Sequence, residues 1–287
     1  MDPLDIEVLR AHVLKKDRSW VLAHPEYVLS KREQSQLEDC LKRRQAGEPV
    51  AYILGEKEFY GRMFAVDPRV LIPRPSTEGL IDLVKNSKFQ APNPKRNSNS
   101  KFQISKIDTG IVGVFLPLNV MVSPCHGELC RTMTFVDIGT GSGCIAITLA
   151  LELPDHHIVA TDIHADALEV ARKNAKRHNV LDSIGFRKGN LLEPVADLHE
   201  TFFVVSNPPY VSTKIPLPPL PNPPPEGEGI FYEPPLALFA GHKGTDVLIP
   251  LVEQAKKHPY CMGIFLECQE DQVKYLLSRR ERIEVRG

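Results

Sequence analysis

The chain has 287 residues, enough for one large domain or two smaller ones, and its 42% hydrophobic and 25% charged residues are ordinary for a soluble globular protein. A formal net charge of -1 gives no electrostatic footprint for nucleic acid or a membrane surface, so we expect neither direct nucleic-acid binding nor membrane association. The six cysteines form no Cys-x-x-Cys pair, which favours free thiols and predicts no metal site. We expect a mitochondrial or cytoplasmic protein, because no clear targeting segment stands in this chain.

Residues 1–48 are typical of a small helical domain. Ile6 and Leu9 recur at the spacing of one helix face. Ser30 and Glu33 predict a capping box, in which the serine caps the third N–H of a helix and the glutamate reaches back to the serine N–H. We expect this domain to have no chemistry of its own and to dock a partner.

Residues 49–84 change to short β-prone runs, which predicts a hairpin that links two domains. Gly55 and Gly61 separate the runs, and glycine is favoured in the turns of such a hairpin. The runs are Tyr52-Ile53-Leu54, Phe59-Tyr60 and Met63-Phe64-Ala65-Val66.

Residues 85–133 lose this periodicity. The stretch 86–105 is rich in Asn, Ser, Lys and Pro, as in a linker. The stretch 111–122 is apolar but is interrupted by Gly113 and Pro117. We expect an insertion that loops off the surface.

A glycine-rich turn follows a strand at the start of the region 134–287. Residues 134–138 are apolar enough for a buried strand, and residues 144–151 favour a helix. Between them lies Gly139-Thr140-Gly141-Ser142-Gly143, preceded by Asp137. Glycines in such a turn let the backbone approach a ligand closely, so this order of elements predicts a nucleotide-type cradle.

Two further strands supply polar residues to the same cradle. Residues 158–162 form a second strand that ends in Asp162, about 20 residues past the glycines, where a carboxylate grips a ribose diol. An alternative role for Asp162 is the N-cap of the following helix. A weaker third strand, 186–189, precedes Asn190 and Leu191, which could border an adenine ring.

The fourth strand, 202–205, leads into Asn207-Pro208-Pro209-Tyr210. The prolines stiffen the backbone, because each fixes φ and restricts the residue before it. A planar –NH2 group has two N–H donors, which the Asn207 side-chain oxygen and the Pro208 carbonyl can accept, while Tyr210 stacks on the planar face. The alternative is a proline-rich turn that merely ends a strand.

The rest of the chain continues the α/β alternation. We expect a helix over 245–257 with Pro250 inside it, a fifth strand over 262–266, a helix over 269–277 and the start of a sixth strand at 282–285. This order predicts an α/β protein with a Rossmann-like sheet.

The chain resembles the HemK/PrmC family of S-adenosylmethionine-dependent protein-(glutamine-N5) methyltransferases. The resemblance implies a class I methyltransferase sheet with a small N-terminal helical domain joined by a β-hairpin. The residues that carry it are Gly47–Gly55, Val70–Pro75, Asp137–Gly143, Asp162, Asn207–Tyr210, Tyr232-Glu233-Pro234, Ala237-Leu238 and Gly241.

The resemblance implies methyl transfer from S-adenosyl-L-methionine to the glutamine of the Gly-Gly-Gln motif in a class-I peptide-chain release factor, the protein partner. The implied catalytic residues are Asn207, Pro208 and Tyr210, and with Pro209 they bind the substrate. The implied cofactor-binding residues are Asp137, Gly139, Thr140, Gly141, Ser142, Gly143, Asp162, Asn190, Leu191 and Asn207.

Several features depart from the family pattern. Ser76 stands where relatives carry an acidic residue, the connection 85–133 is longer than usual, and 216–229 is unusually rich in proline. We also expect the methyltransferase domain to lack its last antiparallel strand, which would leave two sheet edges unpaired. These departures motivate one alternative, a catalytically impaired member that only binds cofactor or partner. A second is adenine-N6 methylation of nucleic acid, since adenine presents the same –NH2 group.

Overall fold

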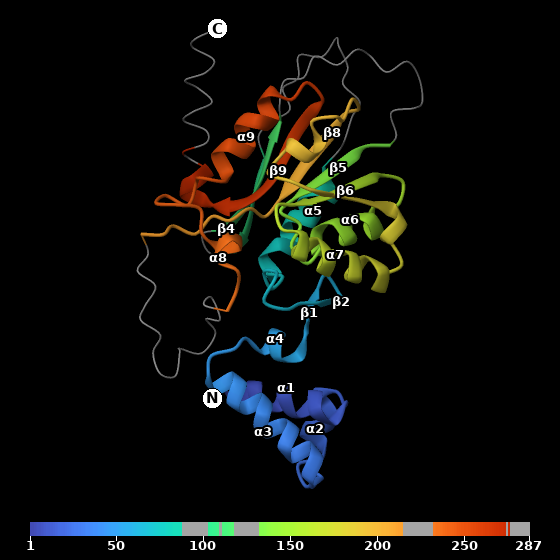
Figure 1. The fold of residues 1–287 in the computed structure, drawn as a ribbon, viewed down its shortest axis with the longest axis vertical. Coiled ribbons are helices and arrows are strands. Elements are labelled where there is room, and N and C mark those ends of the chain that lie inside the picture. Colours follow the sequence, from blue (N-terminus) through green and yellow to red (C-terminus); the bar gives the residue numbers. More distant parts are fainter. Residues whose placement is uncertain (88–102, 109–110, 118–131, 215–231, 274, 276–287) are drawn as a thin grey trace.

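The structure is a computed structural model that describes residues 1–87, 103–108, 111–117, 132–214, 232–273 and 275 (Figure 1). Its helices and strands are, in chain order, α1 Pro3–Leu14, α2 Arg18–Ala23, α3 Lys31–Gln45, α4 Val50–Leu54, β1 Glu56–Phe59, β2 Arg62–Ala65, α5 Glu78–Asn86, β3 Gln103–Asp108, β4 Ile111–Pro117, β5 Thr134–Ile138, α6 Cys144–Glu152, β6 His157–Asp162, α7 Ala165–Arg177, β7 Ile184–Lys188, β8 Phe202–Ser206, α8 Pro235–Leu238, α9 Leu248–Lys257 and β9 Cys261–Gln269.

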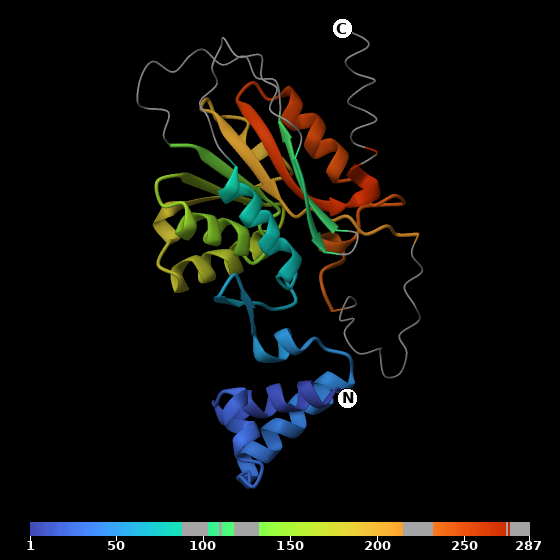
Figure 2. The ribbon, with the colours of Figure 1, turned by 180° about the vertical axis from the view of Figure 1, so that it is seen from behind.

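The N-terminal helices α1 to α3 form a small group at one end of the molecule (Figures 1 and 2). The capping box is present: Glu33 N–H donates to the Ser30 hydroxyl at 3.3 Å, and Ser30 N–H donates to the Glu33 carboxylate at 2.8 Å. Leu9 is fully buried against Cys40 and Ile53, which joins these helices to α4. The prediction of a helical N-terminal segment is confirmed.

The hairpin β1–β2 is antiparallel, as predicted, but the first β-prone run is not a strand. Tyr52-Ile53-Leu54 lies in α4. A short run of apolar residues cannot be assigned by periodicity alone. The segment is helical because a helix lets Tyr52 and Ile53 bury their side chains in two different hydrophobic clusters. Gly55, with φ at 75°, ends this helix.

A seven-stranded sheet carries the rest of the fold, in the order β3-β4-β9-β8-β5-β6-β7. The strands β9, β8, β5, β6 and β7 run parallel to one another, and β4 is antiparallel to both β9 and β3. This is the Rossmann-like sheet that the strand and helix order predicted, and it agrees with the class I sheet that the resemblance implied.

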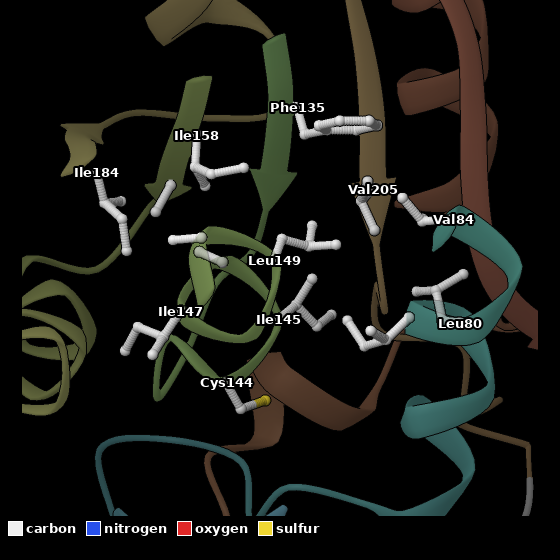
Figure 3. Packing of buried hydrophobic residues seen from close by; sticks show 14 of the residues in the cluster. Leu80, Val84, Phe135, Cys144, Ile145, Ile147, Leu149, Ile158, Ile184 and Val205 are labelled. Carbon is white, nitrogen blue, oxygen red and sulfur yellow. The ribbon is translucent and has the colours of Figure 1, made fainter. Parts of the chain in front are cut away.

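Two hydrophobic layers cover the two faces of the sheet. Phe135 and Val205 point to the layer that contains α5 and α6, as Figure 3 shows. Val136 and Val204 point to the opposite layer, where α9 packs. Neighbouring strand residues therefore alternate between faces that are both buried, which explains why β5 and β8 read as continuous apolar runs.

The hairpin β3–β4 corrects the prediction of a surface insertion. All residues of β4 pair with β9, from Ile111 opposite Gln269 to Pro117 opposite Gly263. The segment looked unpartnered because its partner lies about 150 residues away, and strand pairing at that distance leaves no local pattern. The prediction of an unpaired edge beside β9 is therefore wrong.

The C-terminal elements follow the predicted alternation. The helix α9 begins at Leu248, so Pro250 falls in its first turn, where a missing N–H costs no helical hydrogen bond. The expected sixth strand at 282–285 and the whole proline-rich stretch 216–229 lie outside the described residues. Within the described part of the chain, no helix is long and apolar enough to cross a membrane.

The pairing of β4 predicts the effect of a proline at its centre. Val114 lies between Ile104 of β3 and Leu266 of β9, so Val114→Pro removes an N–H from the sheet. We expect the free energy of unfolding to fall by about 1–3 kcal/mol, measured by urea denaturation. Val114→Ala, which keeps the N–H, is the control. Equal unfolding midpoints for the two variants would contradict this pairing.

Candidate active site

A cavity of about 230 Å³ lies at the carboxyl ends of the parallel strands, where ligands bind in open α/β sheets. The turns after β5, β6, β7 and β8 line it, together with residues before α5 and around α8. The lining residues used below are Val70, Leu71, Gly139, Gly141, Asp162, Ile163, Asn190, Leu191, Asn207, Pro208, Pro209, Leu236 and Ala237.

The glycine-rich turn forms one wall of the cavity. Gly139 and Gly141 have φ of +72° and +54°, and a Cβ on either would meet no atom within 4 Å. Their backbone is thus bare on the side that lines the cavity. Gly143 has another role, because its Cβ would lie 3.1 Å from the Ala171 Cβ. That glycine allows α6 to begin close against α7.

Asp137 does not line the cavity but binds the glycine-rich turn from the protein interior. Its Oδ2 accepts hydrogen bonds from the Thr140 hydroxyl at 2.6 Å and from the Ala146 N–H at 3.1 Å. The side chain is fully buried, and burial raises its pKa to about 7 against the pull of those two bonds. Its Oδ1 has no hydrogen-bond partner among the described residues.

Asp162 stands at the end of β6 and faces the cavity. Its Oδ2 accepts from the Gly141 N–H at 3.0 Å, and its Oδ1 accepts from the His164 N–H at 2.9 Å. Asp162 thus orders the turn into α7 and lines the cavity, but the N-cap of α7 is His164, so the N-cap reading of Asp162 is wrong, while its ribose role stays a prediction. An ionised carboxylate has about four acceptor positions, so lone pairs remain for ligand hydroxyls.

The turn after β7 closes the cavity beside Asp162. Gly189 N–H donates to the Asp162 carbonyl at 3.0 Å. Leu191 has φ at 48°, which is rare for a residue with a side chain, and Leu192 N–H is held by the Gln254 side chain at 3.1 Å. These contacts fix Asn190 and Leu191 at the wall.

Asn207 lies at the end of β8 with its side chain held from the far side. Its Nδ2 donates to the hydroxyl of Thr77 at 2.9 Å, and Thr77 is only 2% exposed. The Asn207 side-chain oxygen is therefore turned away from Thr77. Pro208 is buried and Pro209 half-buried, and both line the cavity.

Tyr210 is held by residues at the end of β9 and does not line the cavity. Its hydroxyl lies 3.4 Å from Glu267, and its carbonyl accepts from the Gln272 side chain at 3.0 Å. Burial, followed by the charge of Glu267, raises the pKa of Tyr210, so the phenol keeps its proton. Gly244 leaves no room for a side chain here, since a Cβ would lie 2.2 Å from the Tyr210 carbonyl oxygen.

Two segments far apart in the sequence clasp each other beside the cavity. The buried Glu233 accepts from the Ile72 N–H at 2.9 Å and forms an ion pair with Arg74. The Tyr52 hydroxyl donates to the Val70 carbonyl at 2.6 Å. The Glu233 contacts hold residues 72–74 against the segment just before α8. The Tyr52 bond holds Val70 against α4.

The structure brings eight predicted site residues to one cavity: Gly139, Gly141, Asp162, Asn190, Leu191, Asn207, Pro208 and Pro209. Five others support the cavity from outside it: Asp137, Thr140, Ser142, Gly143 and Tyr210.

Several other residues line the cavity without any predicted role. Val70 and Leu71 belong to Val70–Pro75, one of the segments that carry the family resemblance, so the resemblance could have marked them as site residues. Ile163 and Leu236 are 52% and 66% exposed and bring apolar surface to the cavity from different elements. No local pattern marks an apolar residue as a cavity wall, because the same pattern describes a core residue.

Comparison with known families agrees with the fold and site. Residues 1–55 match the PrmC N-terminal domain, and residues 102–215 match the methyltransferase small domain. The second match and the fold indicate a methyltransferase domain.

Individual relatives narrow this class. A release factor glutamine methyltransferase of Koribacter versatilis is 34% identical over 267 residues, which cover 92% of this chain and 77% of that protein. One of Aliivibrio fischeri is 31% identical, over 89% of this chain and 73% of that protein. The chain belongs to the release factor glutamine methyltransferase family.

Longer relatives also match. A bifunctional methyltransferase of Rickettsia bellii is 38% identical over 95% of this chain, but the match covers only 46% of that protein. The chain therefore spans about half the length of these bifunctional relatives.

The position of Asp162 predicts a selective loss of cofactor affinity. We expect Asp162→Asn to weaken binding of S-adenosylmethionine about 10- to 100-fold, because a charge-assisted hydrogen bond is lost. Isothermal calorimetry measures this. Asp166→Asn, an exposed residue in the first turn of α7, is the matched control and should bind normally. Equal affinity of both variants would argue against a ligand role for Asp162.

The raised pKa of Asp137 predicts a pH dependence of stability. Between about pH 4 and pH 7 the folded protein keeps a proton that the unfolded chain has lost, so the free energy of unfolding falls as pH rises through this window. Asp137→Asn cannot titrate, so its unfolding free energy should depend less on pH. Urea denaturation of both proteins at several pH values tests this. Parallel curves would show that Asp137 does not contribute.

Proposed function

We propose that this chain transfers the methyl group of S-adenosyl-L-methionine to the side-chain amide nitrogen of the glutamine in the Gly-Gly-Gln motif of a class-I peptide-chain release factor. One observation carries this proposal: a single cavity is lined by the glycine turn, by Asp162 and by Asn207-Pro208-Pro209. A cofactor cradle and an amide clamp therefore open onto the same space. The names of the relatives that share most of their length with this chain support the choice of substrate.

The cavity has the features that S-adenosylmethionine needs. The bare backbone at Gly139 and Gly141 allows close approach of the ligand, and Asp162 supplies acceptors for ribose hydroxyls. Ile163 and Leu191 provide apolar surface for a planar base. When bound, the cofactor supplies a methyl group on a positively charged sulfur, a good leaving group.

Asn207 and Pro208 orient the acceptor amide. The Thr77 hydroxyl takes up the Asn207 NH2, so the side-chain oxygen of Asn207 remains to accept one substrate N–H. The Pro208 carbonyl accepts the other, which aims the nitrogen lone pair along a line set by the protein. Orientation of this kind can supply roughly 7–11 kcal/mol in favourable cases, so the site needs no strong base. The amide proton then leaves to water.

The N-terminal helices are the proposed docking surface for the release factor. Leu22, Tyr27 and Val28 lie at the end of α2 and just after it, and Val28 is 86% exposed. Large apolar side chains that stay exposed together favour contact with another protein. The Tyr232 hydroxyl donates to the Ala46 carbonyl at 2.7 Å and thereby ties these helices to the segment before α8.

The clamp predicts the effect of removing the Asn207 amide. We expect Asn207→Ala to lower the rate of methyl transfer to a release factor about 100-fold, because the acceptor nitrogen loses its orientation. Transfer of labelled methyl from S-adenosylmethionine measures the rate. Asn86→Ala removes an exposed amide at the end of α5 and serves as the control.

Two substrates separate this function from the alternatives. A release factor in which the motif glutamine is replaced should accept no methyl group, and duplex DNA assayed alongside should accept none. Equal modification of the replaced factor would overturn the assignment to glutamine. Label in DNA alone would favour adenine methylation.

A further inference from the structure

One short stretch of the chain, residues 70–77, contacts both halves of the candidate site. At its start, Val70 and Leu71 line the cavity beside the cofactor cradle. At its end, the Thr77 hydroxyl accepts the hydrogen bond from the Asn207 side chain at 2.9 Å. The position of this stretch therefore sets part of the cavity wall and the side chain of Asn207 together.

A buried carboxylate holds the middle of the stretch. The Glu233 side chain is only 2% exposed, accepts from the Ile72 N–H at 2.9 Å and forms an ion pair with the Arg74 guanidinium. The Arg74 carbonyl in turn accepts from the Thr77 N–H at 3.0 Å. A shift of Arg74 would thus also move Thr77.

The residues that follow Glu233 supply another wall of the same cavity. Pro234, Leu236 and Ala237 all line it. Because proline fixes φ, the link between the carboxylate and this wall has little freedom. Glu233 therefore joins two cavity walls whose bonded residues, Ile72 and Glu233, lie 161 positions apart in the sequence.

The chemistry of this contact favours geometry over stability. Removing a carboxylate from water is costly, and apolar side chains of similar shape often hold two segments together as well or better. A guanidinium and a backbone N–H on one carboxylate instead fix both the distance and the direction of approach. Glu233 does not line the cavity, so it affects the site only through the segments that it joins.

We propose that Glu233 is a positioning residue for methyl transfer, which holds the cavity walls on either side of it and, through Thr77, the Asn207 side chain; the inference rests on the proposed function. Its ion pair with Arg74 is the contact that fixes this geometry.

Glu233→Gln and Arg74→Gln test the proposal in the full-length chain. The first keeps an acceptor for the Ile72 N–H but loses the charge that pairs with Arg74, and the second removes the guanidinium. We expect each variant to bind S-adenosylmethionine about tenfold more weakly in calorimetry and to have a kcat about tenfold lower, because the walls and Asn207 lose their alignment. Arg74→Lys, which keeps the charge, should restore part of both losses.

A matched ion pair elsewhere controls for general damage. Arg62 of β2 and Glu152 of α6 pair at 2.7 Å, both are partly buried, and neither lines the cavity. Arg62→Gln should lower the urea midpoint of unfolding but leave the cofactor affinity and kcat of the folded protein at wild-type values. A merely structural role for Glu233 would give its variants the same behaviour as Arg62→Gln.

The double variant tests whether the two residues act as one contact. Glu233→Gln combined with Arg74→Gln should lower affinity and kcat no further than the worse single change. A wild-type value of either quantity in Arg74→Gln, or multiplied losses in the double variant, would overturn the proposal. Should Glu233→Gln fail to fold, the comparison of Arg74→Gln with Arg74→Lys still decides, because the Arg74 side chain is 36% exposed.

Cofactor binding separates failure of this proposal from failure of the proposed function. If the wild-type chain binds S-adenosylmethionine but methylates no release factor, while the variants still lose affinity, the proposed function is wrong and the role of Glu233 in holding the cavity walls stands. Methyl transfer by the wild type with unchanged affinity in the variants overturns the role of Glu233 alone. A wild-type chain that binds no S-adenosylmethionine overturns both.

Discussion

The parallel pairing of β6, β5, β8 and β9 is the constraint on which the whole site depends. Parallel strands end at the same edge of a sheet, so the residues that follow them meet there regardless of their separation in sequence. Glu267, Asn207, Gly139 and Asp162 follow one another in this order along that edge. A shift in register of one residue would exchange the two buried faces and move each of these side chains away from the others.

Two buried carboxyls support this edge from within the protein. Asp137 accepts hydrogen bonds from Thr140 and Ala146 in and after the glycine-rich turn. Glu267 accepts them from the hydroxyls of Ser76 and Tyr210, near Asn207. Both have raised pKa values because burial disfavours the charged form. Each carboxyl therefore lies beside a turn that lines the cavity without lining the cavity itself.

Local patterns predicted the parts of this structure that depend on neighbours in sequence. The buried strand β5, its glycine turn and the capping box at Ser30 each have a short signature, and each is present. The pairing of β4 with β9, the Arg74–Glu233 clasp and the Thr77–Asn207 bond join residues more than a hundred positions apart. No spacing rule encodes such partners, because they are chosen by how the sheet folds. The site could thus be predicted as a set of residues but not as a network.

These long-range contacts also involve Ser76 and the edge of β9, two of the features that motivated the alternative of a catalytically impaired protein. Ser76 stands where the resemblance led us to expect an acidic residue, and its hydroxyl lies 3.1 Å from Glu267 and adds a hydrogen bond to a buried acid. A carboxyl at position 76 would place a second acid beside Glu267, and two such groups cannot both ionise at close range. The edge of β9 that seemed exposed is paired with β4. Two of the departures, Ser76 and the edge of β9, therefore have a compensating contact among the described residues.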